Sequence, residues 1–221
     1  KNYIVKNENK IILISKIIIM LLFISGMIYQ QVYFRYYISN QYWWDLRTYK
    51  EFALLRPIYV TGEEAYMCLY QPYFIWLWYP MTFLSLEYAY IIMIIINFNS
   101  LIFTLFYILP KLKIIDIHLE KMILIIYLLS IYEHGRWQNI EITISMIYLW
   151  LWSKEITQKN IFLHSFIASL FSFKILSLVF IPVFALKSKR FITYIVLSVL
   201  FLFLLNIYWI IQYPYIIDMN F

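Results

Sequence analysis

The residues best suited to chemistry lie in the longest polar interruption of an otherwise apolar chain. From Arg35 to Glu64 the sequence holds eight charged side chains, among them Asp45 and Arg47, interleaved with tyrosines and tryptophans. A carboxylate beside cations can take a proton from a hydroxyl group, while arginine and lysine can hold a phosphate. The same charges are also compatible with a surface ion pair on a solvated loop, which would have no chemical role.

Two further polar positions, far away in the sequence, can meet this stretch. Arg136 lies in the polar turn predicted over residues 133–141, and Lys174 interrupts the apolar run of residues 161–186. An ionisable group at the centre of a membrane helix costs about 2.5 to 3.5 kcal/mol, so several converging ones indicate function. Each also has a purely structural interpretation, in which Arg136 anchors a helix end and Lys174 extends to the membrane surface.

The composition shows which elements must position these residues. Of 221 residues, 64% are hydrophobic and 22% aromatic, with only three glycines, which predicts an integral membrane protein and not a water-soluble one. The alternation expected of a transmembrane barrel is absent. The net charge of +6 is gathered in clusters that flank apolar runs, so it reports membrane topology and not nucleic-acid binding. The single cysteine, Cys68, excludes an internal disulfide.

We therefore predict an all-α fold, a polytopic transmembrane helical bundle of seven or eight membrane segments that forms one domain over residues 1–221. Its N-terminus lies in the cytoplasm, or in the matrix if the protein is organellar, because basic residues precede the first span. Residues 30–71 then form an extracytoplasmic loop with a short amphipathic helix. The apolar segments cover residues 11–29, 72–86, 88–109, 122–132, 142–152, 161–186 and 191–211.

Residues 72–86 leave two topologies open. The segment is short and contains Pro80, so it either crosses the membrane completely or turns back as a re-entrant hairpin. We favour the hairpin, because it keeps the basic loop of residues 111–121 on the inner side. By the same rule residues 161–186 form a hairpin with Lys174 at its outer tip. Lys16 is expected to extend to the membrane surface, and Asn97 and Asn99 to join helices.

The order of these features resembles a known family. Four elements follow each other along the chain. They are Asp45-Leu-Arg-Thr-Tyr49 in the first outer loop, Tyr66-x-x-x-Tyr70-x-Pro72 before the next span, Gly135-Arg-Trp-Gln138-Asn139, and Lys174 at a later hairpin tip. This order is similar to that of polyprenol-phosphate-dependent glycosyltransferases of the GT-C fold, in particular the mannosyltransferase-like family 87. The middle motif has a different spacing here, Lys174 and Pro72 lack the following proline, and family members are commonly nearly twice as long.

The resemblance implies transfer of a mannose-like hexose from a polyprenyl-phosphate donor to an acceptor on the outer or lumenal face. Asp45 would be the general base, and no metal or further cofactor is implied. The residues implied in substrate binding are Arg47, Tyr49, Tyr66, Tyr70, Arg136, Gln138, Asn139 and Lys174. The partners would be the lipid-linked sugar and membrane lipids.

A second hypothesis comes from another class. The chain is also compatible with a non-catalytic accessory subunit of a larger membrane complex, such as an organelle-encoded respiratory subunit, which would explain its small size and degenerate motifs. Its polar loop would then dock other membrane subunits. Convergence of Asp45, Arg136 and Lys174 around a lipid-accessible cavity distinguishes the enzyme from the subunit.

Overall fold

The computed structural model describes residues 2–34, 73, 79–115, 117–137, 140–172 and 175–212. Throughout these ranges the regular structure is helical, without a strand. Three helices are long and apolar enough to cross a membrane, namely Glu8–Val32, Tyr88–Leu112 and Phe191–Tyr208. The predicted class of helical membrane protein agrees with these helices. The predicted amphipathic helix of the outer loop lies outside the described residues.

The described helices fall into two compact units. The first unit contains α1 (Asn2–Tyr29), the π-helix η1 (Gln30–Phe34), α5 (Leu86–Phe103), the π-helix η5 (Thr104–Ile108), α6 (Leu109–Ile115), α7 (Ile117–Trp137) and α8 (Glu141–Trp152) as far as Leu149. The second contains Tyr73, the 3₁₀-helix η4 (Tyr79–Phe83), the end of α8, α9 (Ile161–Leu170), η6 (Ile175–Val179), α10 (Phe180–Lys187) and α11 (Phe191–Gln212).

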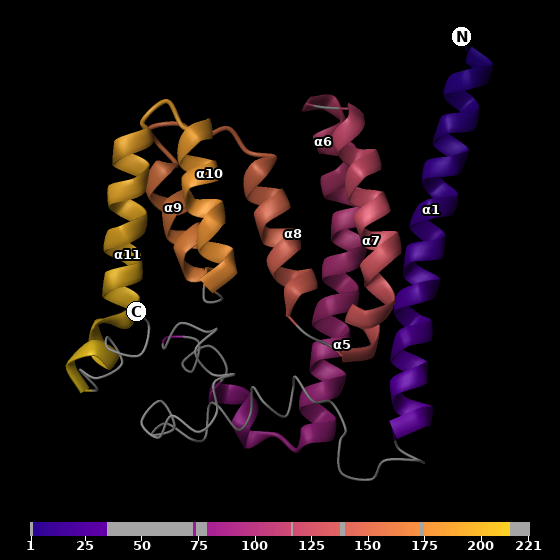
Figure 1. Cartoon of the computed structure of the whole chain (residues 1–221), viewed down its shortest axis with the longest axis horizontal. Helices are drawn as coiled ribbons and strands as arrows, with labels where there is room; N and C mark the ends of the chain where they lie inside the picture. Colours follow the sequence, from indigo (N-terminus) through magenta and orange to yellow (C-terminus); the bar gives the residue numbers. More distant parts are fainter. Residues whose placement is uncertain are drawn as a thin grey trace. The chain divides into compact units, whose positions relative to one another are not determined.

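In the first unit, α1 and α7 lie side by side and run in the same direction (Figure 1). Two glycines allow their backbones to touch. A Cβ atom added to Gly26 would lie 2.2 Å from the carbonyl oxygen of Tyr132, and one added to Gly135 would lie 2.2 Å from that of Phe23. Small residues permit such close crossings of membrane helices. Gly135 is therefore a packing residue of α7.

Helix α5 runs antiparallel to α1. Phe98 of α5 stacks on Phe23 of α1 with ring centroids 6.1 Å apart. Phe106, which follows α5 in the sequence, has its ring centroid 5.9 Å from Nζ of Lys16, which precedes Phe23 in α1. The chain consequently leaves α1 and enters α5 at the same end of the first unit.

Polar side chains join α8 to its neighbours in this unit. The hydroxyl of Thr143 donates to Oδ1 of Asn97 at 3.1 Å and lies 3.1 Å from the hydroxyl of Ser100. The expectation that Asn97 joins helices is confirmed. It is wrong for Asn99, whose exposed amide donates to the carbonyl of Ile95 within the same helix.

The prediction for Lys16 is also wrong. Its ammonium group does not extend to the surface but donates to Oε1 of Glu120 on α7 at 3.1 Å, and both side chains are buried. The parallel packing of α1 and α7 places an opposite charge within reach at this depth. An ion pair removes much of the penalty that an isolated buried charge would carry.

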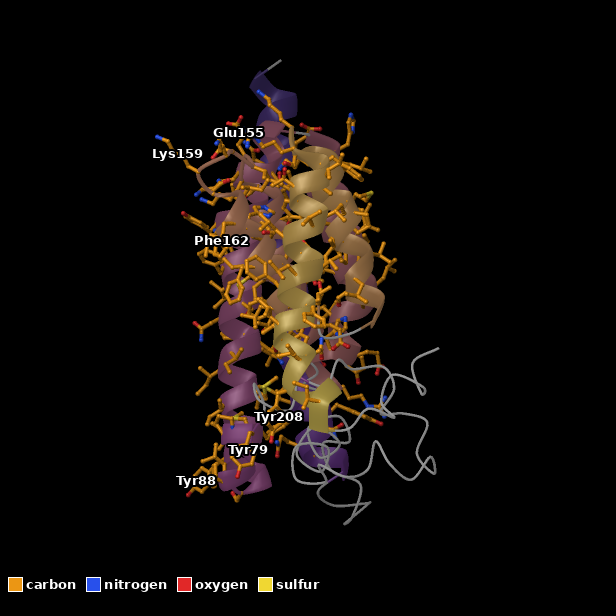
Figure 2. All side chains as sticks on the ribbon, turned by 90° about the vertical axis from the view of Figure 1, so that its left-hand side faces the viewer. Tyr79, Tyr88, Glu155, Lys159, Phe162 and Tyr208 are labelled. Atoms are coloured by element: carbon orange, nitrogen blue, oxygen red, sulfur yellow. The ribbon has the colours of Figure 1, made fainter. Side chains whose placement is uncertain are left out.

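In the second unit, α9, η6 and α10 form a helical hairpin, as predicted for residues 161–186. Its two ends meet, since Arg190 donates to Oε1 of Gln158 at 2.8 Å, and Lys187 donates to the carbonyls of Trp152 and Lys154. Helix α11 packs along α9 through a buried hydrogen bond of 3.1 Å from Ser169 to the carbonyl of Ser198. Figure 2 shows Lys159 in the connector before α9, pointing away from the helices.

Two predicted polar loops are largely helical. Residues 111–115 belong to α6, and His118 to Lys121 belong to α7, so these residues of the expected loop are helical. Likewise α7 continues through Trp137, which places Gly135 and Arg136 in its last turns and not at the start of the next helix. The close contact of Gly135 with α1 explains why the helix extends through this polar sequence.

Candidate functional site

Arg136 is the predicted site residue that falls within the part of the chain that the structure describes. The other predicted site residues lie outside the described ranges, so their roles stay predictions. They are Asp45, Arg47, Tyr49, Tyr66, Tyr70, Gln138, Asn139 and Lys174.

The guanidinium group of Arg136 is held at the end of α7 by two neighbours. Its central carbon lies 5.1 Å from the centroid of the Tyr29 ring, and Nη1 lies 3.6 Å from Oε2 of Glu133, one turn earlier. The side chain is 24% exposed. A cation over an aromatic face gains about 0.5 to 2 kcal/mol, and a cation also suits the negative end of a helix dipole. The group is therefore positioned by α1 and α7 together and still reaches the surface.

The end of α1 contributes a residue that the sequence analysis missed. Gln30 is completely buried, and its side-chain amide finds no hydrogen-bond partner among the described residues. An unsatisfied buried polar group costs about 1 to 3 kcal/mol. Gln30 also begins η1, and single turns of π-helix often occur at functional sites. The signal for Gln30 in the sequence is an amide side chain directly after the apolar run of residues 11–29, which otherwise indicates only a membrane span.

In the second unit, Tyr73 directly follows one of the motifs on which the resemblance rests and contacts α9. Its side chain is 2% exposed, and its hydroxyl donates to the carbonyl of Ser169 on α9 at 2.8 Å. Tyr73 directly follows Pro72, and Ser169 precedes Lys174 by five positions in the sequence. Tyr73, the residue after this element, is thus joined to α9, the first helix of the hairpin.

His164 has a structural role. Its Nε2 lies 3.1 Å from the carbonyl of Leu151 and its Nδ1 lies 2.9 Å from the hydroxyl of Tyr194. Because a carbonyl only accepts hydrogen bonds, Nε2 carries the proton and Nδ1 accepts from the tyrosine. Both ring nitrogens are then used within the protein. Within the described ranges, no group of three or more His, Cys, Asp or Glu side chains is arranged to hold a metal ion.

Comparison with protein-family models, curated proteins and solved structures finds no match to this chain.

The two local assemblies offer complementary chemistry. In the first unit, Arg136 can present a planar fork of donors to a phosphate, and the nearby α1 end carries the amide of Gln30, which can bind hydroxyl groups. In the second unit, Tyr73 is held against α9 by its hydrogen bond to Ser169.

Proposed function

We propose that the chain is a membrane-embedded glycosyltransferase of the GT-C type, which moves a mannose-like hexose from a polyprenyl phosphate to an acceptor. The observation that carries this proposal is the buried hydrogen bond of 2.8 Å between Tyr73 and Ser169. It joins the residue that follows the Tyr-x-Pro element to α9, the helix before Lys174, although the two bonded residues are 96 positions apart. Both elements would serve one site in an enzyme of this type.

The first unit supports the proposal independently. The segment that contains Asp45 follows η1 in the sequence, and η1 leaves α1 at the end where Tyr29 lies against Arg136. The proposed base and the proposed phosphate ligand are therefore connected to the same end of this unit.

Our proposed topology has the N-terminus in the cytoplasm and seven or eight membrane segments. If α1 and α5 both cross the membrane, their antiparallel packing requires the connection between them to begin and end on one side. This favours the re-entrant alternative for residues 72–86 over a single complete crossing. The polar loop of residues 30–71, Arg136 and the hairpin tip of Lys174 then belong to the outer or lumenal face.

In the proposed reaction, Asp45 takes the proton of an acceptor hydroxyl as its oxygen attacks the anomeric carbon of the donor sugar. The bond between that carbon and the phosphate oxygen breaks, and the polyprenyl phosphate leaves with inversion of the anomeric configuration. Negative charge grows on the departing phosphate, so cations must face it. Arg136, Arg47 and Lys174 are assigned this task, Arg136 through bidentate hydrogen bonds.

The sugar is assigned to neutral side chains. Gln138 and Asn139 follow Arg136 in the sequence, and their amides are assigned to the hydroxyl groups of the sugar. The tyrosines of the outer loop supply hydroxyls and aromatic faces, and they are Tyr49, Tyr66 and Tyr70. Polyprenyl phosphate is the lipid partner, and no metal takes part in the proposed step.

The test is transfer of radiolabelled mannose or glucose from its polyprenyl phosphate, detected by thin-layer chromatography, in membranes containing the full chain. Asp45→Asn removes the proposed base and should lower the rate by a factor of about 10² to 10⁴. Glu8→Gln is the matched control, because Glu8 is an exposed carboxylate whose ion pair with Lys121 is remote from Arg136 along α1 and α7. Wild-type transfer by Asp45→Asn, with an unchanged melting temperature, would refute the assignment.

A further inference from the structure

A buried ion pair within a candidate membrane span has no role in the proposed transfer reaction. Lys16 belongs to the span Glu8–Val32, and its Nζ lies 3.1 Å from Oε1 of Glu120, with side chains only 8% and 3% exposed. Charged groups at this position are costly and usually mark binding sites or pathways. A hydrophobic pair would hold α1 and α7 together at least as well, so the charges call for another explanation.

The two charged groups line a cavity of about 280 Å³. Its walls combine these charges with one amide and several apolar side chains, contributed by Asn9, Ile12, Leu13, Lys16, Phe106, Pro110 and Glu120. Pockets that enclose drug-sized ligands have volumes of roughly 300 to 1,000 Å³. This cavity therefore suits a small, strongly polar group and not a large ligand.

The cavity opens beside apolar surface. Leu13 and Phe106, which line it, are themselves 51% and 46% exposed, and Ile17, on the next turn of α1, is 47% exposed. Within a membrane this surface would face acyl chains. A ligand with a polar head and apolar tails would match both parts.

We propose that the Lys16–Glu120 cavity binds the head group of a phospholipid that carries a primary ammonium and a phosphate, of the phosphoethanolamine class. The phosphate accepts from the ammonium of Lys16 and the amide of Asn9. The ammonium of the lipid donates to the carboxylate of Glu120. The acyl chains lie along the exposed apolar surface of α1 and η5.

The pairing of opposite charges selects among the common head groups. A phosphocholine head has no N–H bond, so it cannot donate to Glu120. A phosphoglycerol head carries no cation, so its hydroxyl groups could donate to Glu120 but could not balance the charge of the carboxylate. A head group with a hydrogen-bonding cation and an anion matches the charges of both side chains.

This site is separate from the proposed glycosyltransferase site. Lys16 and Tyr29 are 13 positions apart in α1, which corresponds to about 20 Å along a helix. The lipid site can therefore be tested without any assay of sugar transfer.

The experiment measures lipid binding to the delipidated full chain in detergent by native mass spectrometry, with dioleoyl phosphatidylethanolamine, phosphatidylcholine and phosphatidylglycerol added at equal concentrations. We expect phosphatidylethanolamine to bind about tenfold more tightly than the other two. Lys16→Met/Glu120→Leu should abolish the preference. This double variant removes both charges together, so neither is left buried alone, and its melting temperature reports folding.

A matched control removes one carboxylate and one ammonium group from the exposed surface of α1 and α7. Glu8→Gln/Lys121→Gln breaks an exposed ion pair of 3.0 Å and should leave the preference unchanged. Equal binding of phosphatidylcholine, preferred binding of phosphatidylglycerol, or a preference that survives in Lys16→Met/Glu120→Leu would overturn the proposal. Binding of soluble phosphoethanolamine as tight as that of the lipid would overturn the assignment to a membrane lipid.

Discussion

The contact between α1 and α7 makes Gly26→Ala a demanding test of the fold. The added Cβ would lie 2.2 Å from the carbonyl oxygen of Tyr132 and 3.0 Å from the backbone nitrogen of Arg136. Since both are backbone atoms, no side chain can move aside, and the helices must separate by about 1 Å, which weakens many of their contacts. Overpacking costs about 1 to 3 kcal/mol, whereas replacing glycine by alanine in a helix returns up to about 1 kcal/mol.

We expect a net loss of about 1 to 2 kcal/mol for Gly26→Ala, which for a chain of this size lowers the melting temperature by about 2 to 8 °C. Thermal unfolding of the purified chain in detergent, followed by circular dichroism, measures it. Gly135→Ala should have a similar effect, and the double variant less than the sum, because both changes push apart the same helices. Ile28→Ala, on an exposed position of α1, is the control. An unchanged or raised melting temperature for Gly26→Ala would show that the backbones do not touch.

Three further predictions concern single side chains. Tyr73→Phe removes the bond to the carbonyl of Ser169 and should cost about 1 kcal/mol in thermal unfolding, while leaving the apolar ring in place. Thr143→Val removes the hydroxyl between α5 and α8 and should cost about 1 to 3 kcal/mol by the same measurement; an equal stability would mean that this hydroxyl does not join the helices. Arg136→Lys keeps the charge but loses the bidentate fork, so glycosyl transfer should fall about tenfold with little change in melting temperature; full activity would remove Arg136 from the phosphate site.

Much of the helical framework could be predicted from hydropathy alone. The last span, predicted over residues 191–211, is α11 (Phe191–Gln212), and the hairpin with basic ends is present in α9 and α10. Long apolar runs bounded by charged residues leave little choice of structure, because a backbone inside lipid must satisfy its own hydrogen bonds. Of the predicted site residues, Arg136 lies in the last turn of α7, and its role in binding stays a prediction.

The rest depends on which helices are neighbours, which hydropathy does not encode. Lys16 was assigned to the surface because its partner, Glu120, was expected in a polar loop. Gly135 was assigned to a turn because its contact with Phe23 is a matter of packing between distant segments. The same holds for Gln30, whose burial, without a hydrogen-bond partner for its amide among the described residues, exists only in the folded chain.

The pairing of Lys16 with Glu120 also has a consequence for biosynthesis. The two residues are separated by 104 positions, so at about 5 to 20 residues per second the ribosome needs about 5 to 20 seconds to make Glu120 after Lys16. During this time α1 carries a charge that α7 cannot yet neutralise. The first helix must therefore wait at the membrane with Lys16 hydrated or held by lipid phosphates, and its final depth is set only when α7 arrives. Translation that pauses before Glu120 should prolong this interval and expose the nascent chain to quality control.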